Sequence, residues 1–305
     1  MNAMTLTYDA ILAAQQRVPA WRVEDLIGGE KQLDFSKSFL PEGLAGVETL
    51  DFLSREERRV LNQIRGHEYL SIFRLVEEFI LPFIMDHARP RLGEGDDRAR
   101  ALLQFAGEEA KHIQLFKRFR ESFDAGFGVR CEVIGPPEAV AAEVLKRHPL
   151  AVGLLVLHIE WMVHKHFLEG AKENGDMDPL FRNLLKHHWT DEVNHAKLDT
   201  LMVQTLGEAC SPEERKMAFD QYLDLGMFLD NALKSQMDMN LDAFMRATGR
   251  RLSESETLSY RNAQMKALRW TYIGSGITHP MFLSAVEGLS PDLRRKAEEV
   301  GPLFC

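Results

Sequence analysis

Apolar residues recur at helical spacing along most of this chain, and glycine or proline separates the helical segments from one another. No segment shows the alternation of apolar and polar residues that is typical of a β-strand, so the predicted fold class is all-α. The predicted helices cover residues 8–16, 54–88, 96–124, 138–147, 149–173, 178–207, 211–248 and 253–272, with a short helix near the C-terminus.

The order and length of these segments predict one domain that is built in three parts. Residues 1–53 form an N-terminal extension that is partly irregular and partly helical. Residues 54–208 contain four long helices joined by short or moderate connections, as in a four-helix bundle. Residues 209–305 add C-terminal helices, which we expect to pack on the bundle.

Two Glu-x-x-His motifs, Glu109 to His112 and Glu192 to His195, lie in the second and fourth long helices. Residues three apart on a helix share one face, so each pair can bind one metal ion. The first and third long helices contribute Glu77 and an acid in an apolar stretch, Glu160. A glutamate from each of two helices and Glu-x-x-His from each of the others form the ligand set of a two-metal carboxylate centre.

The four glutamates are expected to lie at one depth of the bundle. In each predicted helical hairpin, the ligand positions are roughly eleven to fourteen residues from the connecting end, about 16–20 Å along the axes. Antiparallel helices therefore bring them level. Carboxylate and imidazole ligands suit iron or manganese, whereas thiolates would favour zinc or iron–sulfur centres.

The first long helix offers three acids, and the sequence leaves the choice between two of them open. Glu68 lies too far from the connecting loop to be level with the other ligands. Glu77 shares an apolar face with Phe73 and Ile84, while Glu78 lies on a more polar face. We prefer Glu77, and Glu78 stays the alternative.

Each Glu-x-x-His motif is preceded by a second acid, Glu108 or Asp191. A metal-bound histidine usually donates its other ring N–H to a carboxylate, so we expect Glu108 and Asp191 to support the histidine of the opposite helix. The alternative is that both are ordinary solvated acids. His188 precedes Glu192 by four residues and shares a face with Glu192 and His195.

These residues resemble the ferritin-like di-iron carboxylate superfamily, and His188 makes the chain most similar to the p-aminobenzoate N-oxygenase family, whose site has three histidines and four carboxylates. The resemblance implies a ferritin-like four-helix bundle. It also implies two iron ions, with manganese as the alternative metal, and O₂ as a co-substrate. The implied metal ligands are Glu77, Glu109, His112, Glu160, His188, Glu192 and His195, with Glu109 and Glu192 in catalytic roles.

The function that this resemblance implies is a non-haem di-iron oxygenase that activates O₂ and N-oxygenates an arylamine. A small-molecule substrate and an external electron donor, a reductase or a ferredoxin, are the expected partners, because no dinucleotide-binding glycine motif is visible. One alternative is another di-iron oxidase: a hydroxylase, a desaturase-like enzyme or a ribonucleotide-reductase-like ligand-binding oxidase. The other is a non-enzymatic ferritin-like iron-binding protein.

Net charge, cysteine content and the first residues limit the classes of partner and the compartment that we expect. The net charge of −9, with both signs spread along the chain, argues against nucleic acid or an anionic membrane as a partner. The three cysteines form no C-x-x-C motif and indicate a reducing compartment. The first residues lack the pattern of a signal peptide, so we expect a cytoplasmic protein, and we consider a homodimer.

Overall fold

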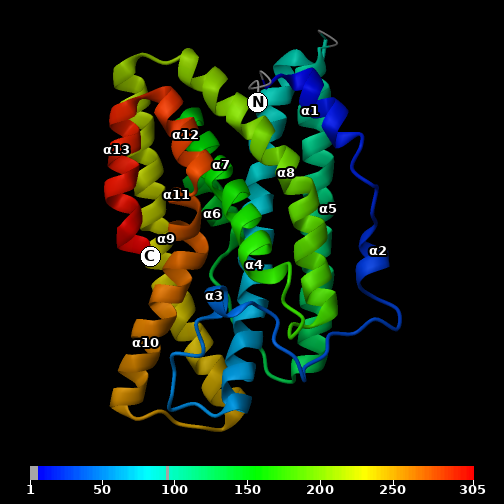
Figure 1. Ribbon diagram of the computed structural model, residues 1–305, viewed down its shortest axis with the longest axis vertical. Helices are drawn as coiled ribbons and strands as arrows, with labels where there is room; N and C mark the ends of the chain where they lie inside the picture. Colours follow the sequence, from blue (N-terminus) through cyan, green and yellow to red (C-terminus); the bar gives the residue numbers. More distant parts are fainter. Residues whose placement is uncertain (1–5, 94–95) are drawn as a thin grey trace.

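The computed structural model describes residues 6–93 and 96–305 (Figure 1). The predicted break at Gly93–Gly95 falls partly on residues 94 and 95, which lie outside the described residues. The first five residues, on which the expectation of no signal peptide partly rests, lie outside them as well.

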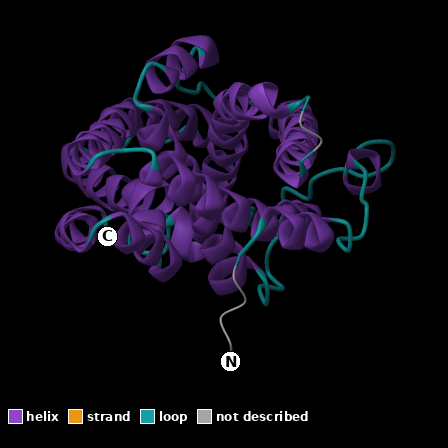
Figure 2. Cartoon of the chain, turned by 90° about the horizontal axis from the view of Figure 1, so that it is seen from above, coloured by secondary structure: helices purple, strands orange, loops and turns teal. Residues whose placement is uncertain are grey.

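Helices make up nearly all the regular structure, and no strand is formed within 6–93 and 96–305 (Figure 2). The prediction of an all-α fold is therefore confirmed. The N-terminal part contains α1 (Tyr8–Gln15), α2 (Val23–Leu26) and α3 (Glu42–Ala45). The bundle consists of α4 (Arg55–Ala88), α5 (Asp97–Phe127), α7 (Pro149–Lys165) and α8 (Pro179–Glu208), with the short α6 (Pro137–Leu145) between its two halves. The C-terminal part contains α9 (Pro212–Thr248), α10 (Glu254–Arg269), α11 (Ser275–Ile277), α12 (Pro280–Leu289) and α13 (Pro291–Val300). Four short segments complete the chain: η1 (Arg89–Arg91), η2 (His166–Ala171), η3 (Trp270–Gly274) and η4 (Gly301–Phe304).

The four bundle helices lie side by side as two antiparallel pairs, α4 with α5 and α7 with α8 (Figure 1). The long helix α9 packs against α4 and α7, and α10 returns along α9. On the other side, α1 lies against α5 and α8, while α2 stands at the outer edge of α5 (Figure 1). The ferritin-like bundle with additional C-terminal helices is thus the observed architecture.

Local sequence signals set the ends of the long helices. Ser54, Ser211 and Ser253 each accept a hydrogen bond from the backbone N–H three residues on, and the backbone N–H of each serine donates to the glutamate carboxylate at that position. Such caps contribute about 1 kcal/mol each. Gly128 and Gly249 end α5 and α9 with positive φ angles of 81° and 69°, which glycine adopts without steric cost.

Two of the predicted helices end earlier than their apolar pattern suggests. The third bundle helix changes at residue 166 into the π-helical turn η2, and α10 changes at residue 270 into η3. A buried polar contact accompanies the first of these turns. His166 lies 3.2 Å from the Tyr69 hydroxyl and 3.0 Å from the Ser275 hydroxyl. Apolar spacing alone does not reveal such an insertion.

The C-terminal region also differs from the prediction of a single short helix. It forms two helices, α12 and α13, because Ser290 is extended and Pro291 cannot continue the preceding helix. The loop expected after Tyr272 contains the one-turn helix α11. Among the helices that the structure describes, none is both long enough and apolar enough to cross a lipid bilayer.

A buried charged network ties α4 to the C-terminal helices, and we call it the Arg65 network. Both carboxylate oxygens of Glu68 lie within 2.8 Å of Arg65 Nη1, and Arg65 Nη2 donates to the Leu44 carbonyl at 2.9 Å. Asn240 of α9 donates to Glu68 and accepts from Gln236 at 2.9 Å. The network was not predicted from the sequence, because Asn240 lies 172 positions from Glu68 along the chain.

Candidate metal centre

The middle of the bundle holds a cluster of four carboxylates and three histidines, which we call the carboxylate–histidine cluster. None of these side chains is more than 2% exposed. Every bundle helix contributes, so the equal depth expected from the distances to the connecting ends is found. The members are Glu77 of α4, Glu109 and His112 of α5, Glu160 of α7, and His188, Glu192 and His195 of α8.

Glu192 lies at the centre of this cluster. Its Oε1 is 2.6 Å from His188 Nε2 and 3.1 Å from His112 Nδ1. Its other oxygen, Oε2, is 2.7 Å from His195 Nδ1. Burial alone would favour the neutral acid, but the neighbouring histidines hold the pKa of Glu192 well below its usual value.

Glu109 faces the same histidines from the opposite helix without forming a proper hydrogen bond. Its Oε1 lies 2.8 Å from His195 Nδ1, and its Oε2 lies 3.5 Å from His112 Nδ1. His195 Nδ1 already contacts Glu192 at 2.7 Å, and one ring nitrogen carries at most one proton. Both oxygens of Glu109 are consequently buried without a hydrogen-bond partner.

Unpaired lone pairs of this kind fit a cation. Burying a carboxylate without a partner costs several kcal/mol, and a metal ion removes that cost for every oxygen that it binds. Two groups of buried residues could each hold an ion, because within each group the ligand atoms all lie within 4.8 Å of one another. They are Glu77, His112, His188 and Glu192, and Glu109, His112, Glu192 and His195.

Glu160 belongs to neither of these two groups, although it is buried next to them. Burial and the nearby Glu192 raise the pKa of Glu160 well above its usual value, and the two carboxyl groups share a hydrogen bond. Glu160 Oε2 has no partner. The structure therefore brings Glu160 to the edge of the cluster, where it faces Glu192.

The second acids of the motifs contact the outward nitrogens of the histidines across the helix pair. Glu108 Oε2 of α5 lies 2.7 Å from His195 Nε2, and Asp191 Oδ2 of α8 lies 3.1 Å from His112 Nε2. If each Nε2 carries the proton, each Nδ1 presents a lone pair to the cluster. Burial opposes charge on either ring, but Glu192 and these outer acids raise both histidine pKa values well above the usual range.

His188 is held differently from the other two histidines. Its Nε2 points into the cluster, 2.6 Å from Glu192 and 3.3 Å from Glu77. Its outward Nδ1 is buried without a partner, and the edges of Phe73 and Phe116 surround the ring at centroid distances of 5.6 and 5.0 Å. Burial accordingly lowers the pKa of His188.

On α4 the structure distinguishes the three acids that the sequence offered. Glu77 is buried and contacts His188. Glu78 is a quarter exposed and pairs with Arg74 at 2.9 Å. Glu68 is buried in the Arg65 network, nine residues before Glu77. Only Glu77 of these three faces the cluster.

Sequence reasoning missed three polar residues around the cluster. Trp21, from the N-terminal extension, donates from Nε1 to Asp191 Oδ2 at 3.1 Å, and Lys111 donates to the same oxygen at 2.7 Å. Asp199 lies one turn after His195, and its Oδ2 is buried without a partner. Its spacing of four from His195 was a usable signal, whereas nothing local linked Trp21 to the bundle.

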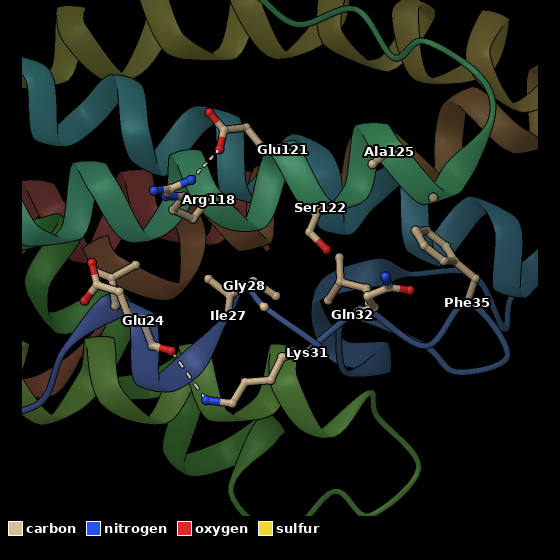
Figure 3. Close-up of a pocket in the computed structure, with 14 residues that line it drawn as sticks. Glu24, Ile27, Gly28, Lys31, Gln32, Phe35, Arg118, Glu121, Ser122 and Ala125 are labelled. Carbon is tan, nitrogen blue, oxygen red and sulfur yellow. Dashed lines mark hydrogen bonds and ion pairs between the residues drawn. The ribbon is translucent and has the colours of Figure 1, made fainter.

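Three cavities among the described residues lie outside the cluster. One of about 820 Å³ lies between the segment around α2 and the outer face of α5, where Lys31, Phe35 and Arg118 are among its lining residues (Figure 3). None of the cluster residues lines it. Two apolar cavities, of about 260 and 70 Å³, lie between α7 and α9 and share Leu155, Leu229 and Tyr272 in their walls.

Comparison with known proteins identifies a family. The sequence model of P-aminobenzoate N-oxygenase AurF matches residues 21–268. None of the curated proteins matches this chain.

Similar solved structures include a variant of the R2-like ligand-binding oxidase with an aerobically reconstituted Mn/Fe cofactor. It has a TM-score of 0.47 and 16% identity over 89% of this chain and 94% of that chain. A second variant, with an anaerobically reconstituted Mn/Fe cofactor, has a TM-score of 0.45 and 15% identity over 87% and 91%. The family match, by contrast, spans most of the sequence and includes the whole carboxylate–histidine cluster. The chain therefore belongs to the p-aminobenzoate N-oxygenase AurF family.

Proposed function

We propose that this protein is an O₂-dependent oxygenase whose carboxylate–histidine cluster holds two iron ions and which oxidises the nitrogen of an aromatic amine. The observation that carries the proposal is the set of buried, unpaired oxygens of Glu77, Glu109, Glu160 and Glu192, which face three histidines. Hard oxygen and imidazole donors in this ratio suit iron, with manganese as the alternative metal.

Each side chain of the cluster has a distinct part in this proposal. Glu109 and Glu192 lie between the histidines of both helices, so they are the candidates to contact both ions. Glu77 of α4 and Glu160 of α7 would each complete the coordination of one ion, and His188 would add a third nitrogen ligand. Two bound iron ions would supply the redox chemistry that converts O₂ into an oxidant.

The surrounding residues orient the ligands and keep water out. Glu108 and Asp191 hold the histidine rings through their outward nitrogens. The Phe105 ring lies tilted against His195 at a centroid distance of 4.0 Å, and Phe116 packs against His188 in a T-shaped arrangement. A dry, preorganised site of this kind strengthens electrostatic interactions and suppresses side reactions.

The two apolar cavities support an uncharged, apolar ring as the substrate. Ile159 and Met162, which flank Glu160 along α7, line the smaller cavity, and Val76, next to Glu77, lines it from α4. The larger of the two cavities extends to the C-terminal segment, where Leu303 and Phe304 line it. We also propose an external electron donor, because the oxygenation of a nitrogen by O₂ requires reducing equivalents that an isolated di-iron site cannot regenerate.

The test is an anaerobic reconstitution with Fe²⁺ followed by mixing with O₂, a chemical reductant and aniline, an uncharged aromatic amine, with the products separated by chromatography. A hydroxylamine or nitro product supports the proposal. Oxygen uptake without an N-oxidised product favours another di-iron oxidase. Iron binding without oxygen consumption, whichever substrate is added, favours a non-enzymatic iron-binding protein.

Two neighbouring acids provide a matched control for that test. Glu77→Gln removes a proposed ligand, whereas Glu78→Gln makes the same change one residue later, at a side chain that pairs with Arg74. We expect Glu77→Gln to lose product formation and Glu78→Gln to retain it. Equal loss in both variants would point to a general effect on α4 rather than to the cluster.

A further inference from the structure

The two histidines of the Glu-x-x-His motifs have unequal outer partners. A single oxygen, Asp191 Oδ2, accepts from three donors: His112 Nε2 at 3.1 Å, Trp21 Nε1 at 3.1 Å and Lys111 Nζ at 2.7 Å. The ammonium group of Lys111 also lies 3.8 Å above the Trp21 ring, and that ring is parallel to His112 at a centroid distance of 6.1 Å.

The partner of His195 divides its contacts differently. Glu108 accepts from His195 through Oε2 at 2.7 Å and from the neutral amide of Gln104 through Oε1 at 3.1 Å. His195 therefore has one carboxylate oxygen to itself, at a distance 0.4 Å shorter than that between His112 and Asp191. Charge-assisted hydrogen bonds strengthen as they shorten, so Glu108 polarises its ring more than Asp191 does.

His112 belongs to both groups of candidate ligands, and only one of the two groups also contains His195. We propose that Lys111 and Trp21 weaken the group that has His112 without His195, here called the His112 position, so that the two positions of the centre fill in order, with the group that contains His195, the His195 position, first. The carboxylate behind a metal-bound histidine raises the basicity of the ring and hence its affinity for the ion. Lys111 and Trp21 take a share of the charge of Asp191, and the positive charge of Lys111 also opposes an incoming cation. This inference rests on the proposed function, because it needs two metal positions.

Lys111 and Trp21 are thus positioning residues: they act on the metal through Asp191 and His112. Both lie at the accessible side of the cluster, since Lys111 is a quarter exposed and Trp21 is half-buried in the N-terminal extension. The His112 position should consequently be the last to fill and the first to release its ion to a chelator.

The experiment is an anaerobic titration of the full metal-free chain with Fe²⁺ in competition with a chromogenic chelator. We expect two binding steps in the parent. Lys111→Met should tighten the weaker step by roughly tenfold, the lower end of the range for changes behind metal-bound histidines. Trp21→Phe keeps an aromatic ring but loses the N–H donor, and it should shift the same step in the same direction by less.

Lys117→Met is the matched control, because Lys117 is exposed on the same helix and the change in charge is identical. It should leave both steps as in the parent. Glu108→Gln should weaken the tighter step and so bring the two steps together. Circular dichroism checks the fold, and Lys111→Gln repeats the test if Lys111→Met does not fold.

Weaker binding in both Lys111 variants would overturn the inference, because a merely structural role for Lys111 predicts loosening. Two equal positions in the parent would overturn it as well. Neither result would affect the proposed function, since two ions would still bind. A parent that binds no iron at all would instead sink the proposed function itself.

Discussion

Two buried charged clusters lie on the same helix, α4, and they are satisfied in opposite ways. In the Arg65 network, both oxygens of Glu68 are paired with Arg65 and Asn240, and Arg65 also reaches the Leu44 carbonyl. Apart from Arg65 Nε, the charged atoms of this ion pair have protein partners. Its acid and its base neutralise each other.

The carboxylate–histidine cluster, nine residues further along α4, has no such balance. It contains four carboxylates and no lysine or arginine among its seven members, and five of its carboxylate oxygens lack a hydrogen bond: both of Glu109 and one each of Glu77, Glu160 and Glu192. Burial alone does not distinguish the two clusters. What distinguishes them is whether a lysine or arginine pairs with the acids. Where none does, a bound cation accounts for the unpaired carboxylate oxygens.

The largest effect is expected from a substitution at the centre of the carboxylate–histidine cluster. Glu192→Ala removes the carboxylate that contacts all three histidines, so metal binding should fall by at least a hundredfold for both ions. Glu109→Ala should behave in a similar way. Elemental analysis of the purified variants measures this directly, and full metal occupancy in both would contradict the assignment.

A substitution in the Arg65 network should change the stability of the protein rather than its metal content. Glu68→Ala leaves the buried Arg65 without its counter-charge, which costs about 3–5 kcal/mol in free energy of unfolding. Chemical denaturation measures this cost. Elemental analysis of the folded fraction should still give the parent's metal content, and loss of metal there would mean that the two clusters are not independent.

His188 tests a smaller part of the comparison, because its outward nitrogen has no carboxylate partner. His188→Ala should keep the fold and weaken one metal position by on the order of 10–100-fold. His87→Ala is the control, since His87 lies on α4 and bonds only to the carbonyl of its own helix. Chelator competition compares the two variants, and parent-like affinity in His188→Ala would exclude it as a ligand.

The smallest effect concerns His166, which is buried without any carboxylate partner. Burial lowers its pKa to about 3, from a usual 6.5. The unfolded chain therefore takes up a proton below pH 6.5 that the folded chain refuses. The stabilisation is complete above about pH 6.5 and is lost as the pH falls toward 3, with about 2 kcal/mol lost between pH 6.5 and 5. Denaturation at several pH values should show that the free energy of unfolding depends less steeply on pH in His166→Asn than in the parent. Equal slopes would contradict the lowered pKa of His166.

Local patterns were sufficient to predict most of the bundle. Helical spacing and caps such as Ser54 and Ser253 placed the long helices, and the spacing of Glu109 from His112 fixed which face they share. Similar distances from the connecting ends of the helices then predicted that Glu77 and Glu160 would reach the depth of Glu109 and Glu192, and the four side chains do lie in one cluster. Their role as metal ligands is the part that stays a prediction.

The features that were missed depend on contacts between distant segments. Trp21 reaches Asp191 across 170 positions, and Asn240 reaches Glu68 across 172. The π-helical turn η2 likewise contains a long-range contact, between His166 and Ser275, which lie 109 positions apart. No periodicity within one segment encodes such pairings.

The most direct test of the central claim is X-ray diffraction from crystals of the iron-loaded protein, with anomalous data collected at the iron absorption edge. The account predicts two anomalous peaks between α4, α5, α7 and α8, in contact with Glu109 and Glu192 and with none near Arg65. A cluster without any peak, or with its carboxylates paired only to protein groups and water, would contradict it.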